Sequence, residues 1–327
     1  MKVAIVTGCS TGIGVEIVRG LAEDDKYGRI ICAVRNPAKM MTVMGQAGYS
    51  HKVIEKCEIV ELNLASLDSV DQFLGRLKVL KITRIDRLVL NAGTKDYSSD
   101  KRTTIDGIDE IWQINYFSNF YLVCALIPVL KASPGSRVVI LSSLMHWFGS
   151  SEAILNLTSQ GTAPDGARLW SAYRDSKLAI TVLGSELCRR GIDAVAVNPG
   201  AVASDIWRRW YEIYLIGPII RLFVLLLFLS CKDGSQTTLY ACRELDENRD
   251  GKLVYLSPYG QIKSRWTITA LLSDIHWFWI AQDRSRFIGQ CVEFVNNSVI
   301  GERVWEKSIG VITSRSTYKS RLYDRMM

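Results

Sequence analysis

The chain has 327 residues, of which 48% are hydrophobic, and a formal net charge of +7 at pH 7. This length holds one α/β domain with extensions or two small domains, and the hydrophobic fraction is enough for a large core. The charge is modest and spread along the chain, which argues against nucleic acid as a partner. The eight cysteines form no Cys-x-x-Cys pair and the three histidines lack metal-ligand spacing, so we expect free thiols and no metal site.

A β-branched run at residues 2–6 predicts a buried strand, and residues 15–23 have helical periodicity. The turn between them contains Gly8, Ser10, Thr11, Gly12, Ile13 and Gly14. Glycines at a strand-to-helix junction let the backbone approach a pyrophosphate, which free N–H groups at the helix N-terminus bind. A glycine-rich turn without a ligand is the alternative, but its position between a strand and a helix favours a dinucleotide loop.

The next predicted strand, residues 29–34, ends at Arg35. In a dinucleotide-binding sheet the tip of this strand faces the adenosine ribose. An acidic residue there binds the 2′-hydroxyl of NAD, whereas a basic residue accommodates the 2′-phosphate of NADP. Arg35 is basic and no acidic residue occurs between Tyr27 and Lys39. An ordinary exposed arginine is the alternative, and we predict NADP(H) as the cofactor.

Tyr173 and Lys177 are four residues apart in a predicted helix, which places their side chains on one face. A tyrosine has an unperturbed pKa of ~10, and a nearby cation lowers that pKa toward neutrality. A phenol of this kind can exchange a proton with an alcohol or carbonyl oxygen. The same spacing also arises by chance on solvated helices, so the pair gains meaning only from its companions.

Further motifs follow the predicted strands in chain order. Asn91-Ala92-Gly93 comes directly after the predicted strand 87–90, and Ser143 ends the predicted strand 137–143. Together with the glycine loop and the acid/base pair, these motifs resemble the short-chain dehydrogenase/reductases. The likeness is narrower to their retinol dehydrogenase-like branch. We therefore expect an α/β fold with a doubly wound parallel sheet of the Rossmann type.

The resemblance extends from residue 2 to about residue 241 in collinear order and implies a role for each motif. It implies that the catalytic tetrad comprises Asn115, Ser143, Tyr173 and Lys177. It also implies that Asn91-Ala92-Gly93 steadies the central sheet and that residues 198–202 pass the nicotinamide. The residues expected to bind the cofactor are Gly8, Ser10, Thr11, Gly12, Ile13, Gly14, Arg35, Asn63, Leu64, Asn91, Ala92, Gly93, Tyr173, Lys177, Pro199, Gly200 and Val202.

Three features depart from the family pattern. Leu90 replaces an asparagine that is common before Asn91. Asn63 stands where the family often has an aspartate near the adenine, and because an amide still hydrogen-bonds there, we expect altered affinity but retained binding. The branch usually begins with a membrane anchor ahead of the first strand, whereas the predicted first strand here starts at Lys2. We therefore expect a cytoplasmic or peripherally membrane-associated protein without an N-terminal signal or anchor.

Residues 213–230 form an apolar segment that is interrupted by Gly217-Pro218 and Arg221. A membrane span, a core helix and a substrate lid are the three interpretations. The arginine and the proline disfavour a span, and the run at residues 222–229 is apolar on all sides, which exceeds what one buried face requires. We favour a lid at about residues 203–232 that covers a lipophilic substrate or contacts a membrane surface.

For the rest of the chain we predict a final strand near residues 253–258 and a terminal helix at residues 301–309, the latter by resemblance. The expected organisation is an NADP-binding Rossmann domain with its lid at residues 1–260, an aromatic-rich helical extension at residues 261–312 and a disordered basic tail at residues 313–327. No catalytic role is assigned beyond residue 251.

These observations predict an NADP(H)-dependent oxidoreductase that interconverts a lipophilic aldehyde or ketone and its alcohol. The expected partner is a lipophilic small molecule. Peripheral membrane contact through residues 213–230 and the formation of a homodimer both stay open. A catalytically silent NADPH-binding sensor or scaffold is the alternative from another class, because a fold does not determine function. Such a protein would be expected to lose Tyr173 or Lys177.

Overall fold

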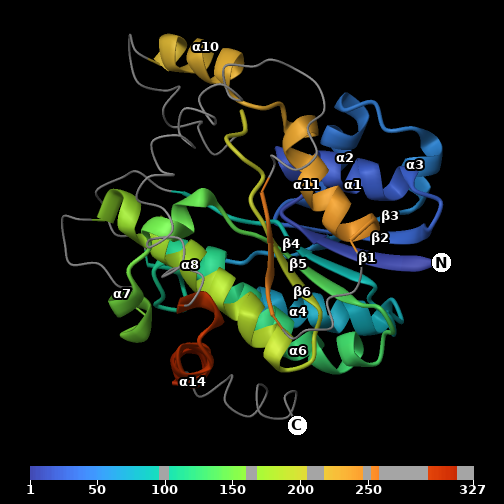
Figure 1. Cartoon of the computed structure of the whole chain (residues 1–327). Helices are drawn as coiled ribbons and strands as arrows, with labels where there is room; N and C mark the ends of the chain where they lie inside the picture. The colour runs from blue at the N-terminus through green and yellow to red at the C-terminus, as the bar shows by residue number, and fades with distance from the viewer. Residues whose placement is uncertain (96–102, 160–167, 205–216, 246–251, 258–293, 315–327) are drawn as a thin grey trace.

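The computed structural model describes residues 1–95, 103–159, 168–204, 217–245, 252–257 and 294–314 (Figure 1). Seven strands in this part of the chain form one parallel sheet in the order β3-β2-β1-β4-β5-β6-β7. The strands are β1 (Lys2–Thr7), β2 (Tyr27–Val34), β3 (Cys57–Glu61), β4 (Arg87–Leu90), β5 (Arg137–Leu141), β6 (Ala194–Val197) and β7 (Val254–Leu256). The strand order reverses between β1 and β4, which makes that position the switch point of a doubly wound sheet. The predicted fold is confirmed.

Helices cover both faces of the sheet (Figure 1). One face carries α1 (Ile13–Glu23), α2 (Pro37–Gln46), α3 (His51–Glu55) and α11 (Cys231–Arg243). The other carries α4 (Leu67–Val79), α6 (Ser118–Lys131), α8 (Arg168–Arg189) and α14 (Ser298–Thr313). Shorter elements connect them: α5 (Glu110–Trp112), the π-turn η1 (Gln113–Phe117), the 3₁₀ helix η2 (Leu144–Phe148), α7 (Ser151–Leu155) and α10 (Gly217–Leu227).

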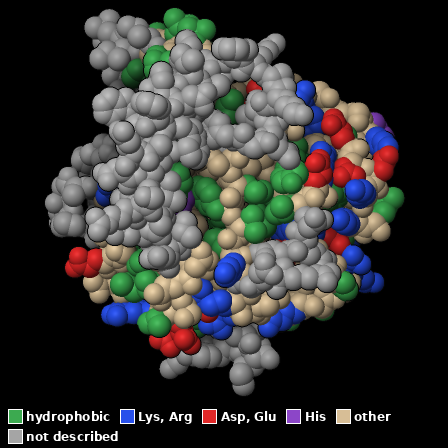
Figure 2. Space-filling model, viewed as in Figure 1, with side chains coloured by type: hydrophobic (Ala, Val, Ile, Leu, Met, Phe, Trp, Pro, Cys, Tyr) green, Lys and Arg blue, Asp and Glu red, His purple; other side chains and the backbone are tan. Residues whose placement is uncertain are grey.

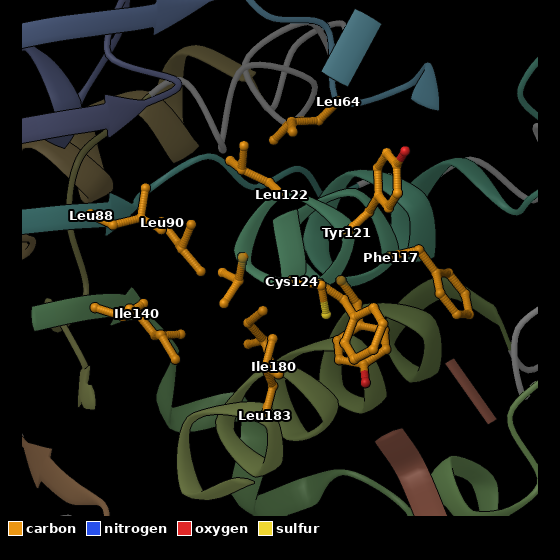
Figure 3. Packing of buried hydrophobic residues seen from close by; sticks show 14 of the residues in the cluster. Leu64, Leu88, Leu90, Phe117, Tyr121, Leu122, Cys124, Ile140, Ile180 and Leu183 are labelled. Carbon is orange, nitrogen blue, oxygen red and sulfur yellow. The ribbon is translucent and has the colours of Figure 1, made fainter. Parts of the chain in front are cut away.

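The sheet separates two hydrophobic cores. Along β1, Ile5 contributes to one core while Ala4 and Val6 contribute to the other, as the two-residue period of a strand requires. Every residue of β4 and β5 is buried, because a parallel sheet is covered on both faces. Figure 3 shows the core beneath α6 and α8, where Leu88 and Ile140 of the strands face the side chains of these helices.

Helix α11 ends against two buried arginines at the amino ends of β4 and β5. The Arg87 Nε donates a hydrogen bond of 2.6 Å to the Cys242 carbonyl. The Arg137 Nη1 donates hydrogen bonds of 2.8 Å to the carbonyls of Ala241 and Leu245. Guanidinium groups at a helix C-terminus satisfy its last carbonyls and complement its dipole, so these contacts fix α11 to the sheet.

Helix α14 packs on α8 and η1 and contributes to the hydrophobic core on the same face of the sheet as α4, α6 and α8. The Tyr116 and Ser308 hydroxyls are 2.7 Å apart, and the rings of Phe120 and Trp305 meet edge to face with centroids 4.8 Å apart. α14 includes the terminal helix expected at residues 301–309. The aromatic stretch at residues 266–280 and the tail from residue 315 lie outside the described residues, so the predicted domain limits stay predictions.

Three predicted elements differ from the structure. Strand β5 ends two residues before Ser143, because the Ser143 hydroxyl accepts a hydrogen bond from the Met145 N–H (3.2 Å) and starts η2. Strand β7 is shorter than the predicted strand 253–258. Pro218, which the sequence suggested as an interruption, lies instead in the first turn of α10, where its missing N–H costs nothing.

One helical stretch among the described residues is long and apolar enough to cross a membrane, Glu110–Lys131, with a mean hydropathy of 1.3. It comprises α5, η1 and α6, and 72% of its apolar window is buried within the protein. Its apolar side chains therefore belong to the hydrophobic core between the sheet and helices α4, α6, α8 and α14. Helix α10 has 11 residues, which is short of the ~20 that a bilayer requires.

Candidate active site

A cavity of about 570 Å³ opens at the carboxyl ends of the strands, where a doubly wound sheet binds its ligand. This volume is typical of small-molecule sites, which measure ~300–1,000 Å³. Of the predicted cofactor residues, the lining includes Gly8, Ser10, Thr11, Gly12, Ile13, Arg35, Asn63, Leu64, Asn91, Ala92, Gly93, Tyr173, Lys177 and Pro199. The structure thus brings most of the predicted site together around one cavity, although these residues come from distant parts of the sequence.

The glycine loop after β1 has the geometry of an anion-binding turn. Gly8 and Gly12 have φ angles of 63° and 60°, in the left-handed region that favours glycine. Gly12 caps α1 without a side-chain hydrogen bond, which leaves the first N–H groups of that helix for an anion. A Cβ on Gly14 would lie 2.6 Å from the Asn91 Nδ2, so Gly14 allows close packing behind the loop. The loop fits a pyrophosphate.

Asn91 connects the end of β4 to this loop. Its Nδ2 donates hydrogen bonds to the carbonyls of Thr7 (2.8 Å) and Gly8 (3.0 Å). The Ala92 N–H donates to the Thr7 hydroxyl (3.0 Å). A Cβ on Gly8 would lie 2.8 Å from Ala92, so only glycine allows these two backbone segments to approach. The contacts hold the loop across the switch point of the sheet.

The end of the cavity next to β2, where an adenosine ribose is expected, carries two basic side chains. Arg35 and Lys39 both line the cavity and are exposed. Asn36 caps α2, since its Oδ1 accepts a hydrogen bond from the Lys39 N–H (3.0 Å), and this cap fixes the backbone at Lys39. The sequence prediction included Arg35 and missed Lys39. A second basic residue within four positions of the strand end was the available signal.

Asn63 and Leu64, which follow β3, also line the cavity. The Asn63 Oδ1 accepts a hydrogen bond from the Ala65 N–H (3.1 Å), and the Asn63 N–H donates to the Ser69 hydroxyl (2.9 Å). The side chain is half-buried and lines the cavity. An amide in this position keeps donor capacity toward a ligand, because its Nδ2 has hydrogens to donate while its Oδ1 fixes the turn.

Helix α8 presents Tyr173 and Lys177 to the cavity, and both side chains are buried. The Lys177 Nζ donates a hydrogen bond of 2.8 Å to the Leu141 carbonyl at the end of β5. The same Nζ lies 5.8 Å from the centroid of the Tyr173 ring. Burial lowers the pKa of Lys177 to about 8, because a low-dielectric environment disfavours the charged form.

The pKa of Tyr173 differs from the sequence prediction. We expected Lys177 to lower it, but burial raises the pKa of Tyr173 above its ordinary value, and the group that lowers it is the Ser143 hydroxyl, through a hydrogen bond. The prediction was wrong in direction because the sequence does not reveal how completely the phenol is removed from water, and desolvation has the largest effect on its pKa.

Asn115 lies in the π-turn η1, behind the cavity wall. Its Oδ1 accepts a hydrogen bond from the Thr94 N–H (2.7 Å), and its Nδ2 donates to the Thr94 carbonyl (2.9 Å). The Nδ2 also donates to the Ser176 hydroxyl (3.1 Å). Single turns of π-helix often occur at functional sites. In this one, the amide clamps the segment that follows β4 and links it to α8.

Ser143 also starts η2, which contains His146. The His146 Nδ1 lies 2.7 Å from the Ser143 carbonyl, and its ring lies 4.8 Å from that of Tyr255. Burial lowers the pKa of His146 to about 4, so the ring is neutral at physiological pH. The structure places His146 inside a 3₁₀ helix, where its ring supports the Ser143 backbone.

The segment after β6 contributes only partly to the cavity. Pro199 lines it, and the Asn198 Oδ1 accepts a hydrogen bond from the Gly200 N–H (3.1 Å). Val202 is buried instead, forms a parallel bridge with Leu229 and packs so closely on α11 that a Cβ on Gly234 would lie 2.5 Å from it. Gly14, Gly200 and Val202 are the predicted cofactor residues that do not line the cavity.

A doubly wound sheet with an anion-binding glycine loop, and a serine, tyrosine and lysine at the carboxyl ends of its strands, defines a nicotinamide-dependent oxidoreductase. The family model described as short chain dehydrogenase matches residues 2–214, more than half of the chain. The chain therefore belongs to the short-chain dehydrogenase/reductase family, whose members bind a nicotinamide cofactor, and it is retinol dehydrogenase-like.

Individual relatives support this family assignment. The chain is 30% identical to the WW domain-containing oxidoreductase of Drosophila melanogaster over 73% of this chain and 58% of that protein, so it spans less than two thirds of that relative. It is 32% identical to mouse retinol dehydrogenase 13 over 77% of this chain and 74% of that protein. The solved Pseudomonas aeruginosa RhlG/NADP active-site complex has a TM-score of 0.57 at 20% identity over 79% of this chain and 95% of that chain, a likeness of fold alone.

Proposed function

We propose that the protein is an NADP(H)-dependent oxidoreductase that interconverts a lipophilic aldehyde or ketone and its alcohol. The observation that carries the proposal is the convergence of Tyr173 and Lys177 on the cavity that also contains the glycine loop. The two cations at the adenosine end, Arg35 and Lys39, support NADP(H) over NAD(H), because they supply positive charge where a 2′-phosphate would lie.

When bound, the nicotinamide cofactor supplies or accepts the hydride. The chain's part is to move a proton and hold the reacting oxygen. Tyr173 donates its phenolic proton to a carbonyl oxygen in reduction and accepts it from an alcohol in oxidation. The Ser143 hydroxyl, which already hydrogen-bonds to the phenol, donates to the same substrate oxygen and positions it.

Lys177 stabilises the phenolate that forms when Tyr173 loses its proton, since its Nζ lies 5.8 Å from the ring centroid. Its ammonium is also the group that would hold the ribose hydroxyls of the cofactor. Burial lowers its pKa to about 8, so it is charged at neutral pH and loses that charge as the pH rises above this value. Asn115 orders the loop beside it and, by family resemblance, holds a water that relays protons to solvent.

Helix α10 supports the lipophilic part of the proposal. Leu222, Phe223, Leu225 and Leu226 are 54–67% exposed, whereas Val224 is buried toward the body of the protein. At 100° per residue the four exposed side chains form one outward stripe. Hydrophobic side chains gather at the top of the view over α10 (Figure 2). A stripe of this kind suits a lid for an apolar substrate that also contacts a membrane surface.

The silent sensor or scaffold is not favoured. That alternative expects the loss of a catalytic side chain, whereas Asn115, Ser143, Tyr173 and Lys177 are all present and lie at the same end of the sheet.

The test is the oxidation of NADPH and of NADH with a panel of carbonyl compounds: retinal, a 3-ketosteroid, a long-chain aldehyde and a short hydrophilic aldehyde. We expect turnover with NADPH that favours the lipophilic carbonyls. Tyr173→Phe should lower kcat by about 10²–10⁴-fold with an almost unchanged Kd for NADPH. Full activity of Tyr173→Phe would refute the mechanism, and a preference for NADH would refute the assignment of NADP(H).

A further inference from the structure

Lys95 is a second lysine beside the candidate acid/base. It follows Asn91-Ala92-Gly93 and Thr94, is half-buried and lines the same cavity as Tyr173. Its Nζ lies 5.7 Å from the centroid of the Tyr173 ring, and the Lys177 Nζ lies 5.8 Å from it. The Tyr173 ring therefore has two ammonium groups at nearly equal distance from its centroid, one from its own helix and one from the segment that follows β4.

The backbone next to Lys95 is held in place. Asn115 binds both polar groups of the Thr94 backbone, by accepting from its N–H at 2.7 Å and donating to its carbonyl at 2.9 Å. A Cβ on Gly93 would lie 3.2 Å from the Lys177 Nζ, so the glycine lets this segment pass close to the catalytic lysine. These contacts fix the direction in which the chain leaves β4, and that direction brings Lys95 to Tyr173.

We propose that Lys95 acts through Tyr173: its ammonium stabilises the phenolate alongside Lys177 and thereby sets the proton affinity of the catalytic tyrosine. This inference rests on the proposed function for its consequence in catalysis. Its electrostatic part rests only on the structure. Lys95 is thus a positioning residue that acts through Tyr173. The family resemblance of the sequence assigns it no role.

The surroundings of Tyr173 show why a second cation matters. Burial raises the pKa of the phenol, so a phenolate needs compensation from nearby positive charge. Among the other groups at this end of the site, Ser143 lowers that pKa through its hydrogen bond, and His146 is neutral above pH ~4. Glu110 lines the same cavity and its carboxylate opposes the effect of the lysines.

Lys95 itself titrates at a pH close to neutrality. Burial lowers the pKa of Lys95 to about 8, because its ammonium is partly removed from water. The charge is present below that pH and is lost as the pH rises through it. The contribution of Lys95 to the phenolate is therefore greatest in neutral solution and fades in alkaline solution, where an arginine in its place would keep its charge.

The test compares the wild-type protein with Lys95→Met, Lys95→Arg and the surface control Lys78→Met, which lies on α4. The direct readout is an NMR titration of Tyr173 in isotope-labelled protein, with Tyr173→Phe identifying the resonance. The pKa of Tyr173 is raised above its ordinary value of ~10, whereas Lys95 loses its charge near pH 8, so wild-type Lys95 is neutral when Tyr173 titrates. An opposite charge at 4–6 Å lowers an acid's pKa by 1–3, so Lys95→Arg, which keeps its charge, should lower the apparent pKa of Tyr173 by about one unit. Lys95→Met and Lys78→Met should both match the wild type in this titration.

The kinetic readout is kcat/KM for alcohol oxidation with NADP⁺ against pH. Because Tyr173 is the base in that direction and Lys95 is charged in neutral solution, kcat/KM at pH 7 should fall about tenfold in Lys95→Met and stay near the wild-type value in Lys95→Arg. The difference between Lys95→Met and the wild type should fade as the pH rises past the Lys95 pKa. The Kd for NADPH should stay within about twofold of the wild-type value. Coincident titration curves for Lys95→Arg and the wild type would overturn the inference, as would a change in Lys95→Met that is confined to the Kd. Absence of turnover in the wild type would refute the proposed function and leave the titration to decide the role of Lys95.

Discussion

Burial controls the proton chemistry of Tyr173 and Lys177. Both side chains are buried, and for both the neutral form is favoured: the pKa of the phenol is raised and the pKa of the ammonium is lowered to about 8. A tyrosine in this state keeps its proton until a charge develops next to it. That behaviour suits a proton donor for carbonyl reduction, whereas oxidation depends on the cations that stabilise the phenolate.

Recognition of the adenosine ribose can be tested at the level of two side chains. The variant Arg35→Ala/Lys39→Ala removes both cations from that end of the cavity. Since a charged hydrogen bond contributes ~1.5–3 kcal/mol, the Kd for NADPH should rise by about tenfold or more and the Kd for NADH by less than about twofold. Binding is measured by calorimetry, with Arg76→Ala on the surface of α4 as the control. Equal losses for both cofactors would show that these groups do not distinguish the 2′-phosphate.

At the scale of elements, helix α10 combines an outward apolar stripe with an inward anchor. Val224 is buried, and the bridge between Val202 and Leu229 ties the end of this segment to the chain that leaves β6. The helix is thus connected directly to the segment that lines the cavity through Pro199. The hydrogen bonds of this bridge, from the Leu229 N–H to the Ala201 carbonyl (2.8 Å) and from the Ala203 N–H to the Leu229 carbonyl (2.9 Å), thus connect the end of α10 to the candidate active site.

The variant Leu225→Glu/Leu226→Glu tests whether α10 contacts lipid. These side chains are 62% and 67% exposed, so their replacement should leave the melting temperature almost unchanged. If they insert into a membrane surface, loss of their apolar burial should lower the partition coefficient by about tenfold or more. The measurement is flotation with phosphatidylcholine vesicles that contain phosphatidylserine. Val79→Glu, at a 69% exposed valine on α4, is the matched control. Equal partition of the wild type and the double variant would exclude lipid contact through this stripe.

At the scale of the whole molecule, a buried arginine joins the sheet, α11 and the turn before β6. Arg137 is 1% exposed and pairs with Asp193 at 2.7 Å, besides its bonds to two carbonyls at the end of α11. Removal of one partner from a buried pair leaves an uncompensated polar group in the interior. This residue therefore contributes to the stability of the whole fold.

Arg137→Met should lower the free energy of unfolding by about 3–5 kcal/mol, the usual cost of breaking a buried ion pair. Urea denaturation followed by circular dichroism measures the change. Lys52→Met is the control, because Lys52 pairs with Asp25 on the surface, where ion pairs contribute little. If the two variants were equally stable, the buried network would have no net effect on folding.

The predictability of the site differed between residues for physical reasons. The glycine loop, Arg35 and the Tyr173–Lys177 pair were recognisable because each depends on local spacing at the end of a strand or along one helix. Lys39 was missed although its position four residues after the same strand end was an available signal. Lys95 was missed because its approach to Tyr173 depends on how the end of one strand packs beside a distant helix. For the same reason Val202 was assigned to the cofactor, although it packs beneath α11.

The sequence by itself indicated the first strand and helix, the tight glycine turn between them and, through the family resemblance, the candidate pair Tyr173 and Lys177, because these features depend on spacing within a few neighbouring residues. The tertiary structure decided which side chains are removed from water, hence the directions of the Tyr173 and Lys177 pKa shifts. It also decided that Asn115 clamps the Thr94 backbone and that Lys95 reaches Tyr173. Those properties depend on desolvation and on distances between residues far apart in the chain, which only the packing of helices on the sheet sets.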